Sequence, residues 1–201
     1  MLQEILKQAT SNQHDQLEQL MFVDKIMNGS LSIEDYKQIL LTNYIVHASL
    51  EQALYENLDS SLQLELQINK RIKLAVLEQD LQELNIAQPE IKPDKNSIQI
   101  PQNNAAVLGA MYVLEGATLG GNVIVKRLKS NPNLQNKHLN FYYYQIYGSD
   151  LVTNWKSFCQ VLNTKVAAED FEISIQSALK VFDYFASTSQ EIADSKIIPQ
   201  T

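Results

Sequence analysis

The 201-residue chain is acidic, with a net charge of −7 and a pI of about 5.0, and 45% of its residues are hydrophobic. This size and composition are typical of one soluble domain, which we expect to span residues 1–201. Two arginines and no block of basic residues argue against a nucleic-acid partner. The single cysteine, Cys159, excludes an internal disulfide and a cysteine-based zinc site.

The first residues are polar and amphipathic and contain no uninterrupted apolar run. We therefore expect no signal peptide, no membrane span and a cytoplasmic location. Apolar residues at helical spacing predict a first helix from about Leu2 to Leu20, before the break at Asn28-Gly29-Ser30. Ser32, with Asp35 three residues later, predicts the N-cap of a second helix of about 25 residues.

The rest of the chain also carries mainly helix signals. Three prolines predict a surface loop from Asn85 to Asn103, and the SIQI alternation at 97–100 is only a weak strand signal because Pro101 ends it. The other predicted helices cover Leu62 to about Leu84, Leu108 to Lys129 (stopped by Ser130-Asn131-Pro132), Asp150 to about Asn163, and Ala168 to about Glu191. The sequence thus predicts an all-α fold of about six or seven helices.

The predicted helix from Leu108 to Lys129 holds four of the six glycines: Gly109, Gly116, Gly120 and Gly121. An interior glycine costs about 1 kcal/mol relative to alanine, so the last three together cost roughly 3 kcal/mol. One interpretation is a flat, large ligand lying against this backbone, where a Cβ would collide with it. The other is close packing between helices, or a kink that glycine permits.

The three histidines differ in their surroundings. His47 lies mid-helix beside leucines, and we expect it to serve packing or hydrogen bonding, whereas we expect His138 to be exposed. His14 stands at the edge of the apolar face of the first helix, one turn before Leu17. A histidine there is either a satisfied core residue or, because imidazole is the usual axial ligand of haem iron, a haem ligand.

Three segments resemble one family. LKQATSNQHDQLE (6–18) resembles the proximal helix of the haem oxygenases, in which a basic residue precedes the iron-ligating histidine by seven positions. LGAMYVLEGATLGGNVI (108–124) looks like the distal helix of the bacterial branch. YGSDLVTNWKSF (147–158) is similar to that branch's Tyr-Gly…Trp-x-x-Phe segment, and the three segments follow the family's order.

The resemblance implies a monomeric enzyme that clamps haem, its substrate and cofactor, between the two helices. His14 matches the iron ligand, Gly116 the first distal glycine, and Gly120 and Gly121 the later pair. O2 is the co-substrate, a ferredoxin or flavin reductase supplies electrons, and the products are biliverdin, CO and Fe²⁺. Ala117 stands where the animal branch has an aspartate, so the resemblance implies a water network for proton delivery.

The resemblance also places basic groups around the two haem propionates. Lys7 and Lys156 match basic residues of the family, whereas Gln160 stands where the animal branch has an arginine. Lys126 and Arg127, near the end of the distal helix, are candidate replacements. Tyr112 is expected either to contact the macrocycle or to be a core aromatic residue.

Three other classes of function stay open at this point. A non-catalytic haem carrier on the same fold would keep His14 but turn nothing over. A di-iron enzyme needs Glu-x-x-His pairs, and the residues three before the histidines are Ser11, Tyr44 and Gln135. A purely structural helical module would leave the glycine cluster without a purpose.

Overall fold

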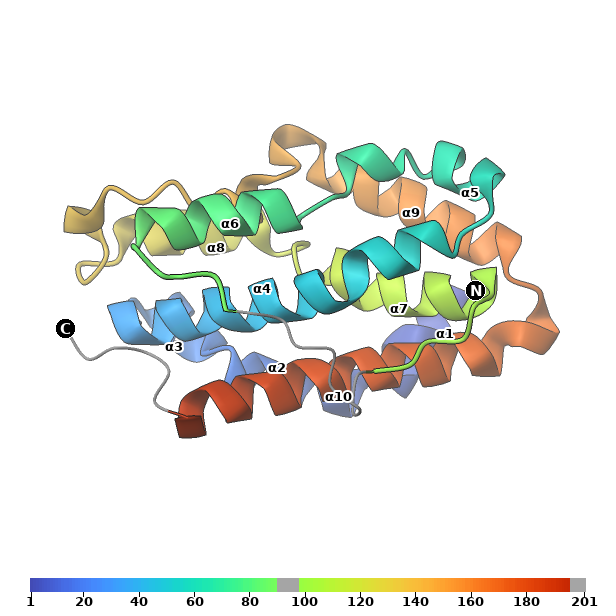
Figure 1. The fold of residues 1–201 in the computed structure, drawn as a ribbon, viewed down its shortest axis with the longest axis horizontal. Helices are drawn as coiled ribbons and strands as arrows, with labels where there is room; N and C mark the ends of the chain where they lie inside the picture. Colours follow the sequence, from blue (N-terminus) through green and yellow to red (C-terminus); the bar gives the residue numbers. More distant parts are fainter. Residues whose placement is uncertain (90–97, 196–201) are drawn as a thin grey trace.

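The computed structural model describes residues 1–89 and 98–195, and all regular structure in these ranges is helical (Figure 1). The all-α prediction is confirmed, whereas residues 90–97 of the predicted Asn85–Asn103 loop, which include the first residue of the SIQI segment, lie outside the described residues. The α-helices are α1 (Leu2–Ala9), α2 (Ser11–Leu20), α3 (Val23–Asn28), α4 (Ile33–Glu56), α5 (Ser60–Glu65), α6 (Leu74–Glu83), α7 (Asn104–Gly116), α8 (Gly121–Ser130), α9 (Leu151–Lys165) and α10 (Phe171–Ser195). The short 3₁₀ helices are η1 (Ile68–Lys70), η2 (Gln135–Lys137), η3 (Tyr143–Gln145), η4 (Gly148–Asp150) and η5 (Ala168–Asp170).

The predicted number of helices is too low because three predicted helices are each divided and because the short helix α3 was not predicted. Thr10 separates α1 from α2, and its hydroxyl donates to the carbonyl of Leu6 at 2.8 Å. The predicted helix from Leu62 to Leu84 is divided at Gln67, whose φ of 52° places it in the left-handed region. Helical periodicity continues across these breaks, so it does not locate them.

The start of α4 follows its local sequence. The Ser32 side chain accepts from the backbone N–H of Asp35 at 3.0 Å, and the Asp35 carboxylate accepts from the N–H of Ser32 at 3.0 Å. This reciprocal capping box satisfies two donors that a helix start otherwise leaves unpaired. The predicted N-cap is therefore confirmed, and α4 then runs through the whole molecule (Figure 1).

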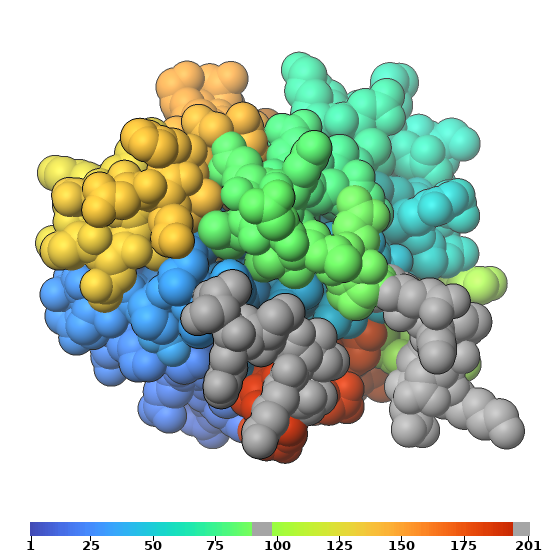
Figure 2. Space-filling model, turned by 60° about the vertical axis from the view of Figure 1, so that its left-hand side comes forward, coloured from blue at the N-terminus to red at the C-terminus, as the bar shows by residue number. Residues whose placement is uncertain are grey.

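Two hydrophobic cores lie along α4. The first core combines α1, the second half of α4, α5, α7, α9 and most of α10. The second combines α3, the first half of α4, α6, α8 and the segment from Leu134 to Tyr144. Figure 2 shows the side of the molecule on which α6 and the segment after α8 lie beside the blue N-terminal helices; residues of α3, α4, α6 and this segment form the second core. The chain passes from the first core to the second between α7 and α8.

The packing of the helices separates α1 and α2 from α7 and α8. We call α1 and α2 the His14 wall, and α7 and α8 the glycine wall. Helix α10 packs against α1, α2 and α7, while α9 bridges α1 and α7, and α3 bridges α2 and α8. Within the described chain, α2 itself has at most marginal contact with α7 and α8. The two walls are therefore joined along one side and at both ends, but they do not pack closely on each other.

The stretch from Asn104 to Ser130 is long and apolar enough to cross a membrane by length and composition alone. More than half of its most apolar window is buried inside the fold, and α7 packs against α4, α9 and α10. A core helix of this kind passes the same test as a membrane span. We therefore interpret the stretch as the core of the fold.

Candidate functional site

The predicted helix from Leu108 to Lys129 is not continuous, because residues 117–120 form a turn between α7 and α8. The N–H of Leu119 donates to the carbonyl of Gly116 at 2.9 Å, and the N–H of Gly121 donates to that of Thr118 at 2.8 Å. These are i to i+3 bonds, which tighten a helix end instead of continuing it. The glycines therefore flank a change of direction, as the kink interpretation expects.

Two of the four glycines are explained by close packing. A Cβ on Gly109 would lie 2.1 Å from the backbone oxygen of Ser174, where α10 crosses α7. A Cβ on Gly121 would lie 2.3 Å from the backbone oxygen of Tyr144. Neither backbone oxygen can move as a flexible side chain can, so these glycines allow α10 and the Tyr144 segment to approach.

Close packing does not explain the glycines at positions 116 and 120. A Cβ on Gly116 would meet only the Trp155 ring, at an ordinary 3.9 Å. A Cβ on Gly120 would meet only the Ile124 side chain of its own helix, at 3.4 Å. Gly120 is exposed, and the neighbouring apolar side chains of Leu119 and Val123 are 38% and 55% exposed. The interpretation that a flat ligand lies against this backbone therefore rests on Gly116 and Gly120 and on the apolar side chains beside them.

His14 lies on α2, and its side chain is 58% exposed. The ring meets the buried ring of Phe182 edge-on, with 6.4 Å between centroids. Nδ1 lies 3.8 Å from Asp15 Oδ1 and 3.8 Å from Glu18 Oε1. Because both carboxylates lie near Nδ1, Nε2 is the ring nitrogen left for an external ligand. Glu18 is not among the predicted site residues, although its i+4 spacing places it on the same helix face as His14.

His14, Asp15 and Glu18 form the one group in the described chain whose ligand atoms lie close enough together to share a metal ion. All three side chains are exposed, and exposed acidic groups are common without an ion. No buried cluster of carboxylates and histidines suited to a di-iron centre is found among the described residues.

The four predicted cations are all exposed and do not lie on one element: Lys7 is on α1, Lys126 and Arg127 are on α8, and Lys156 is on α9. Helices α1 and α9 pack together, which brings the elements of Lys7 and Lys156 into one half of the molecule. Helix α8 lies in the other half (Figure 1). The cations therefore offer two separate places for an anionic group.

Tyr112 is half-buried, and its ring lies 5.7 Å from that of Trp155. Trp155 in turn lies 5.9 Å from the buried ring of Phe158. Burial raises the pKa of Tyr112 to about 12, so its hydroxyl keeps its proton at neutral pH. This aromatic row joins α7 to α9 beside Gly116.

A buried ionic network surrounds the last turn of α7. It was not predicted from the sequence. Glu115 is 2% exposed; its Oε2 accepts from Arg71 Nη1 at 2.6 Å and from the Tyr147 hydroxyl at 2.8 Å. Its Oε1 accepts from Lys73 Nζ at 2.5 Å. Burial alone would raise the pKa of Glu115, but Lys73 and Arg71 outweigh it and hold the pKa below its ordinary value. Glu115 is the only charged residue from Asn104 to Val125. This isolated charge is the sequence feature that could have indicated the network.

A second buried carboxylate, Glu51, continues this network into α4. Its oxygens accept from the backbone N–H groups of Lys73 at 2.8 Å and Leu74 at 3.1 Å, and His47 Nδ1 lies 2.8 Å from Oε2. Burial lowers the pKa of His47 despite Glu51, so the ring is neutral at pH 7. The prediction that His47 serves packing and hydrogen bonding is confirmed, and His138 is exposed as predicted.

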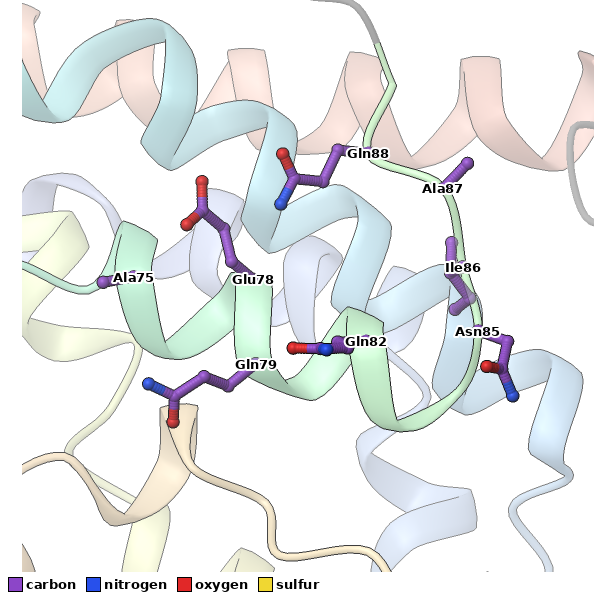
Figure 3. A pocket seen from close by; sticks show the side chains of 8 residues that line it. All are labelled: Ala75, Glu78, Gln79, Gln82, Asn85, Ile86, Ala87 and Gln88. Carbon is purple, nitrogen blue, oxygen red and sulfur yellow. The ribbon is translucent and has the colours of Figure 1, made fainter.

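Two described pockets have no lining residue from α2 or from the turn between α7 and α8. One, of about 630 Å³, is lined by side chains of α6 and of the segment 85–88, among them Glu78, Gln82 and Gln88 (Figure 3). The other, of about 280 Å³, lies between α4 and residues 98–107. Neither is lined by His14 or by a glycine, so neither corresponds to the predicted site.

The profile of the family described as "Heme oxygenase" matches residues 1–191. The chain belongs to the haem oxygenase family. It is 28% identical over 82 residues to the heme oxygenase 1 of Gallus gallus, a match that covers 40% of this chain and 28% of the chicken protein. The fold is similar to that of the NO- and CO-bound heme oxygenase of Neisseria meningitidis, with a TM-score of 0.73, 19% identity and coverage of 95% and 91% of the two chains. It is also similar to the heme-bound heme oxygenase-1 of Synechocystis sp. PCC6803, with a TM-score of 0.70, 18% identity and coverage of 96% and 93%.

Proposed function

We propose that this protein is a haem oxygenase that cleaves haem oxidatively to biliverdin, CO and Fe²⁺. The observation that carries the proposal is the match of the family over residues 1–191, in a fold that holds His14 on one wall and the glycine turn on the other. When bound, haem would supply both the iron that activates O2 and the macrocycle that is cleaved. The non-catalytic carrier gains no support from the comparisons.

His14 is the proposed iron ligand, through Nε2. A ligating imidazole needs its other nitrogen held by an acceptor, which fixes the ring orientation and the tautomer. Glu18 and Asp15 lie 3.8 Å from Nδ1, so a small side-chain rotation brings either oxygen within hydrogen-bond distance. Phe182 supports the ring edge from α10. Glu18 is the better candidate because α-helical i+4 residues face each other.

The glycine wall would cover the opposite face of haem. Gly116 and Gly120 keep the backbone there free of Cβ atoms, while Gly121 lets the start of α8 approach the backbone of Tyr144. Leu119 and Val123 would lose water contact against the macrocycle. Each fully buried aliphatic side chain contributes about 1.5–3 kcal/mol. Tyr112 would meet the macrocycle edge beside Trp155. No side-chain base is assigned to the glycine wall; water would deliver protons.

The propionates would be held by exposed cations at the rim. Lys7 and Lys156 form one candidate pair because their helices pack together, and Lys126 and Arg127 of α8 form the other. An exposed ion pair contributes only about 0–1 kcal/mol, so these groups would set haem orientation more than affinity. Electrons would come from a ferredoxin or a flavin reductase. A monomeric, cytoplasmic enzyme fits such donors.

The test is a haem titration followed by a turnover assay. The parent protein should give a Soret band that saturates at one haem per chain, and a reductant with O2 should convert haem to biliverdin. His14→Ala should lose or strongly alter the band, with recovery at most on addition of imidazole. His138→Ala, also at an exposed histidine, is the matched control and should behave as the parent.

Haem bound without biliverdin would establish the carrier instead. An unchanged spectrum in His14→Ala would show that His14 is not the ligand. Lys7→Ala and Lys156→Ala should change the ratio of biliverdin isomers more than total turnover. If both variants give the isomer ratio of the parent, Arg127 and Lys126 become the proposed partners of the propionates.

A further inference from the structure

Glu115 occupies a costly position. It lies in the last turn of α7, where the helix dipole disfavours a negative charge, and it is almost fully buried. Replacing a buried ion pair by apolar side chains is often neutral or stabilising, so stability alone does not explain it. The preceding residues Val113 and Leu114 are buried and apolar, and an apolar residue at 115 would continue their pattern.

The partners of Glu115 come from two other segments that meet at the end of α7. Arg71 and Lys73 come from the connection between α5 and α6, and Tyr147 comes from the segment before α9. Arg71 also donates to the backbone oxygen of Asn154 at 3.2 Å, one residue before Trp155. The same guanidinium therefore fixes both the end of α7 and the part of α9 that faces Gly116.

The network is balanced in charge and largely satisfied. It contains two carboxylates, Glu51 and Glu115, and two cations, Arg71 and Lys73. Both cations pair with Glu115, Glu51 accepts from the backbone N–H of Lys73, and His47 is neutral. The backbone carbonyl of Glu115 accepts from the Thr118 hydroxyl at 3.1 Å, which ties the anchored residue to the turn that follows it. Fully bonded buried networks of this kind hold one arrangement against alternatives.

We propose that Glu115 is a positioning residue: held by Arg71, Lys73 and Tyr147, it fixes the direction in which the turn carries Gly120 and α8 away from α7. This inference rests on the proposed function for its purpose, because the turn is where haem would be covered. Glu115 is buried behind the turn, so it would act through Gly116 and the turn and not by contact with haem.

The first test of this positioning role removes one hydrogen bond to Glu115 and leaves every charge in place. Tyr147→Phe deletes the donor to Glu115, and Tyr55→Phe is its matched control, because the buried Tyr55 hydroxyl donates to the carbonyl of Arg71 in the same neighbourhood. In the haem-free proteins, amide hydrogen exchange of residues 117–122 should be about tenfold faster in Tyr147→Phe than in Tyr55→Phe, as expected for one lost hydrogen bond to a charged group. Equal exchange in the two variants overturns the proposal.

The stronger test compares two buried carboxylates of the network. Glu115→Gln should shift the C–O stretching band of the reduced, CO-treated haem complex and lower kcat, with haem affinity unchanged. Glu51→Gln, which lowers stability without touching α7, should leave the band in place. A shift of the same size in both variants means that the network only stabilises the fold, and it overturns the proposal. The exchange measurement needs no haem, so it decides the role of Glu115 even if the parent binds none.

Discussion

At the scale of single residues, the two neighbouring glycines of the turn have different roles. A Cβ on Gly121 would overlap the backbone oxygen of Tyr144, whereas a Cβ on Gly120 would contact only the side chain of Ile124. The sequence presents them as an equivalent pair. The structure separates a glycine that permits packing from a glycine that keeps a surface open.

This difference gives a direct prediction. Gly121→Ala should lower the free energy of unfolding by about 1–3 kcal/mol, the usual cost of overpacking, and Gly120→Ala should change it by less than about 0.5 kcal/mol. Urea unfolding of both variants measures this. Gly120→Ala should nevertheless impair haem turnover. Full turnover in Gly120→Ala would remove the ligand interpretation of that residue.

Asp80 makes stability depend on pH. It is 2% exposed and accepts from the backbone N–H groups of Tyr142 and Tyr143 at 2.8 and 2.9 Å. Burial outweighs these bonds and raises the pKa of Asp80 to about 6. A folded-state pKa above the unfolded value means that the folded state binds this proton more tightly. Stability is therefore lost as pH rises through the interval between the two values.

We expect Asp80 to lower the free energy of unfolding by about 2 kcal/mol between pH 4 and pH 7. Asp80→Asn cannot ionise, so the difference in stability between variant and parent should shift in favour of the variant over this range. Urea unfolding at several pH values measures the difference, and Asp24→Asn, at an exposed aspartate, is the control. A difference that stays constant from pH 4 to pH 7 would contradict the raised pKa.

At the scale of helices, the packing of α7 on α10 depends on Gly109. A Cβ there would overlap the backbone of Ser174, whose hydroxyl also donates to the carbonyl of Ala105 at 2.7 Å. The crossing is thus fixed by a backbone approach and by a hydrogen bond on the same two helices. The crossing therefore also sets how closely α7, and with it the glycine wall, approaches α10.

Gly109→Ala should destabilise the protein by about 1–3 kcal/mol or more, because a backbone must shift. Gly116→Ala, on the same helix with only an ordinary contact to Trp155, is the matched control and should gain up to about 1 kcal/mol from helix propensity. Thermal unfolding of both variants tests the contrast. Equal melting temperatures would show that α7 and α10 adjust freely at this crossing.

The sequence predicted the helices better than their ends. Ser32 and Asp35 carry a local signal, and the start of α4 was correct; Pro132 likewise marked the end of α8. The breaks at Thr10 and Gln67 depend on tertiary packing, which periodicity does not report. The same limit applies to the site: the motifs named His14 and the glycines, but only the packed chain brings Arg71 and Lys73 to Glu115.

At the scale of the whole molecule, His14 lies outside both cores. His14 is mostly exposed, so its replacement should leave the stability of the haem-free protein within about 0.5 kcal/mol of the parent. Haem at a concentration of 100 times its Kd should raise the parent's free energy of unfolding by about 2.7 kcal/mol. His14→Ala should lose most of this increment at the same haem concentration. Calorimetry with and without haem measures it, and an equal gain in both proteins would exclude His14 as ligand.

The aromatic row beside Gly116 has an optical consequence. Trp155 is the single tryptophan of the chain, and it lies against the first core at the end of α7. The indole emission of the entire protein therefore originates at one place, next to the glycine wall. A porphyrin covering that wall would absorb this emission by energy transfer, so the arrival of haem and the departure of biliverdin can be timed by fluorescence without an added label.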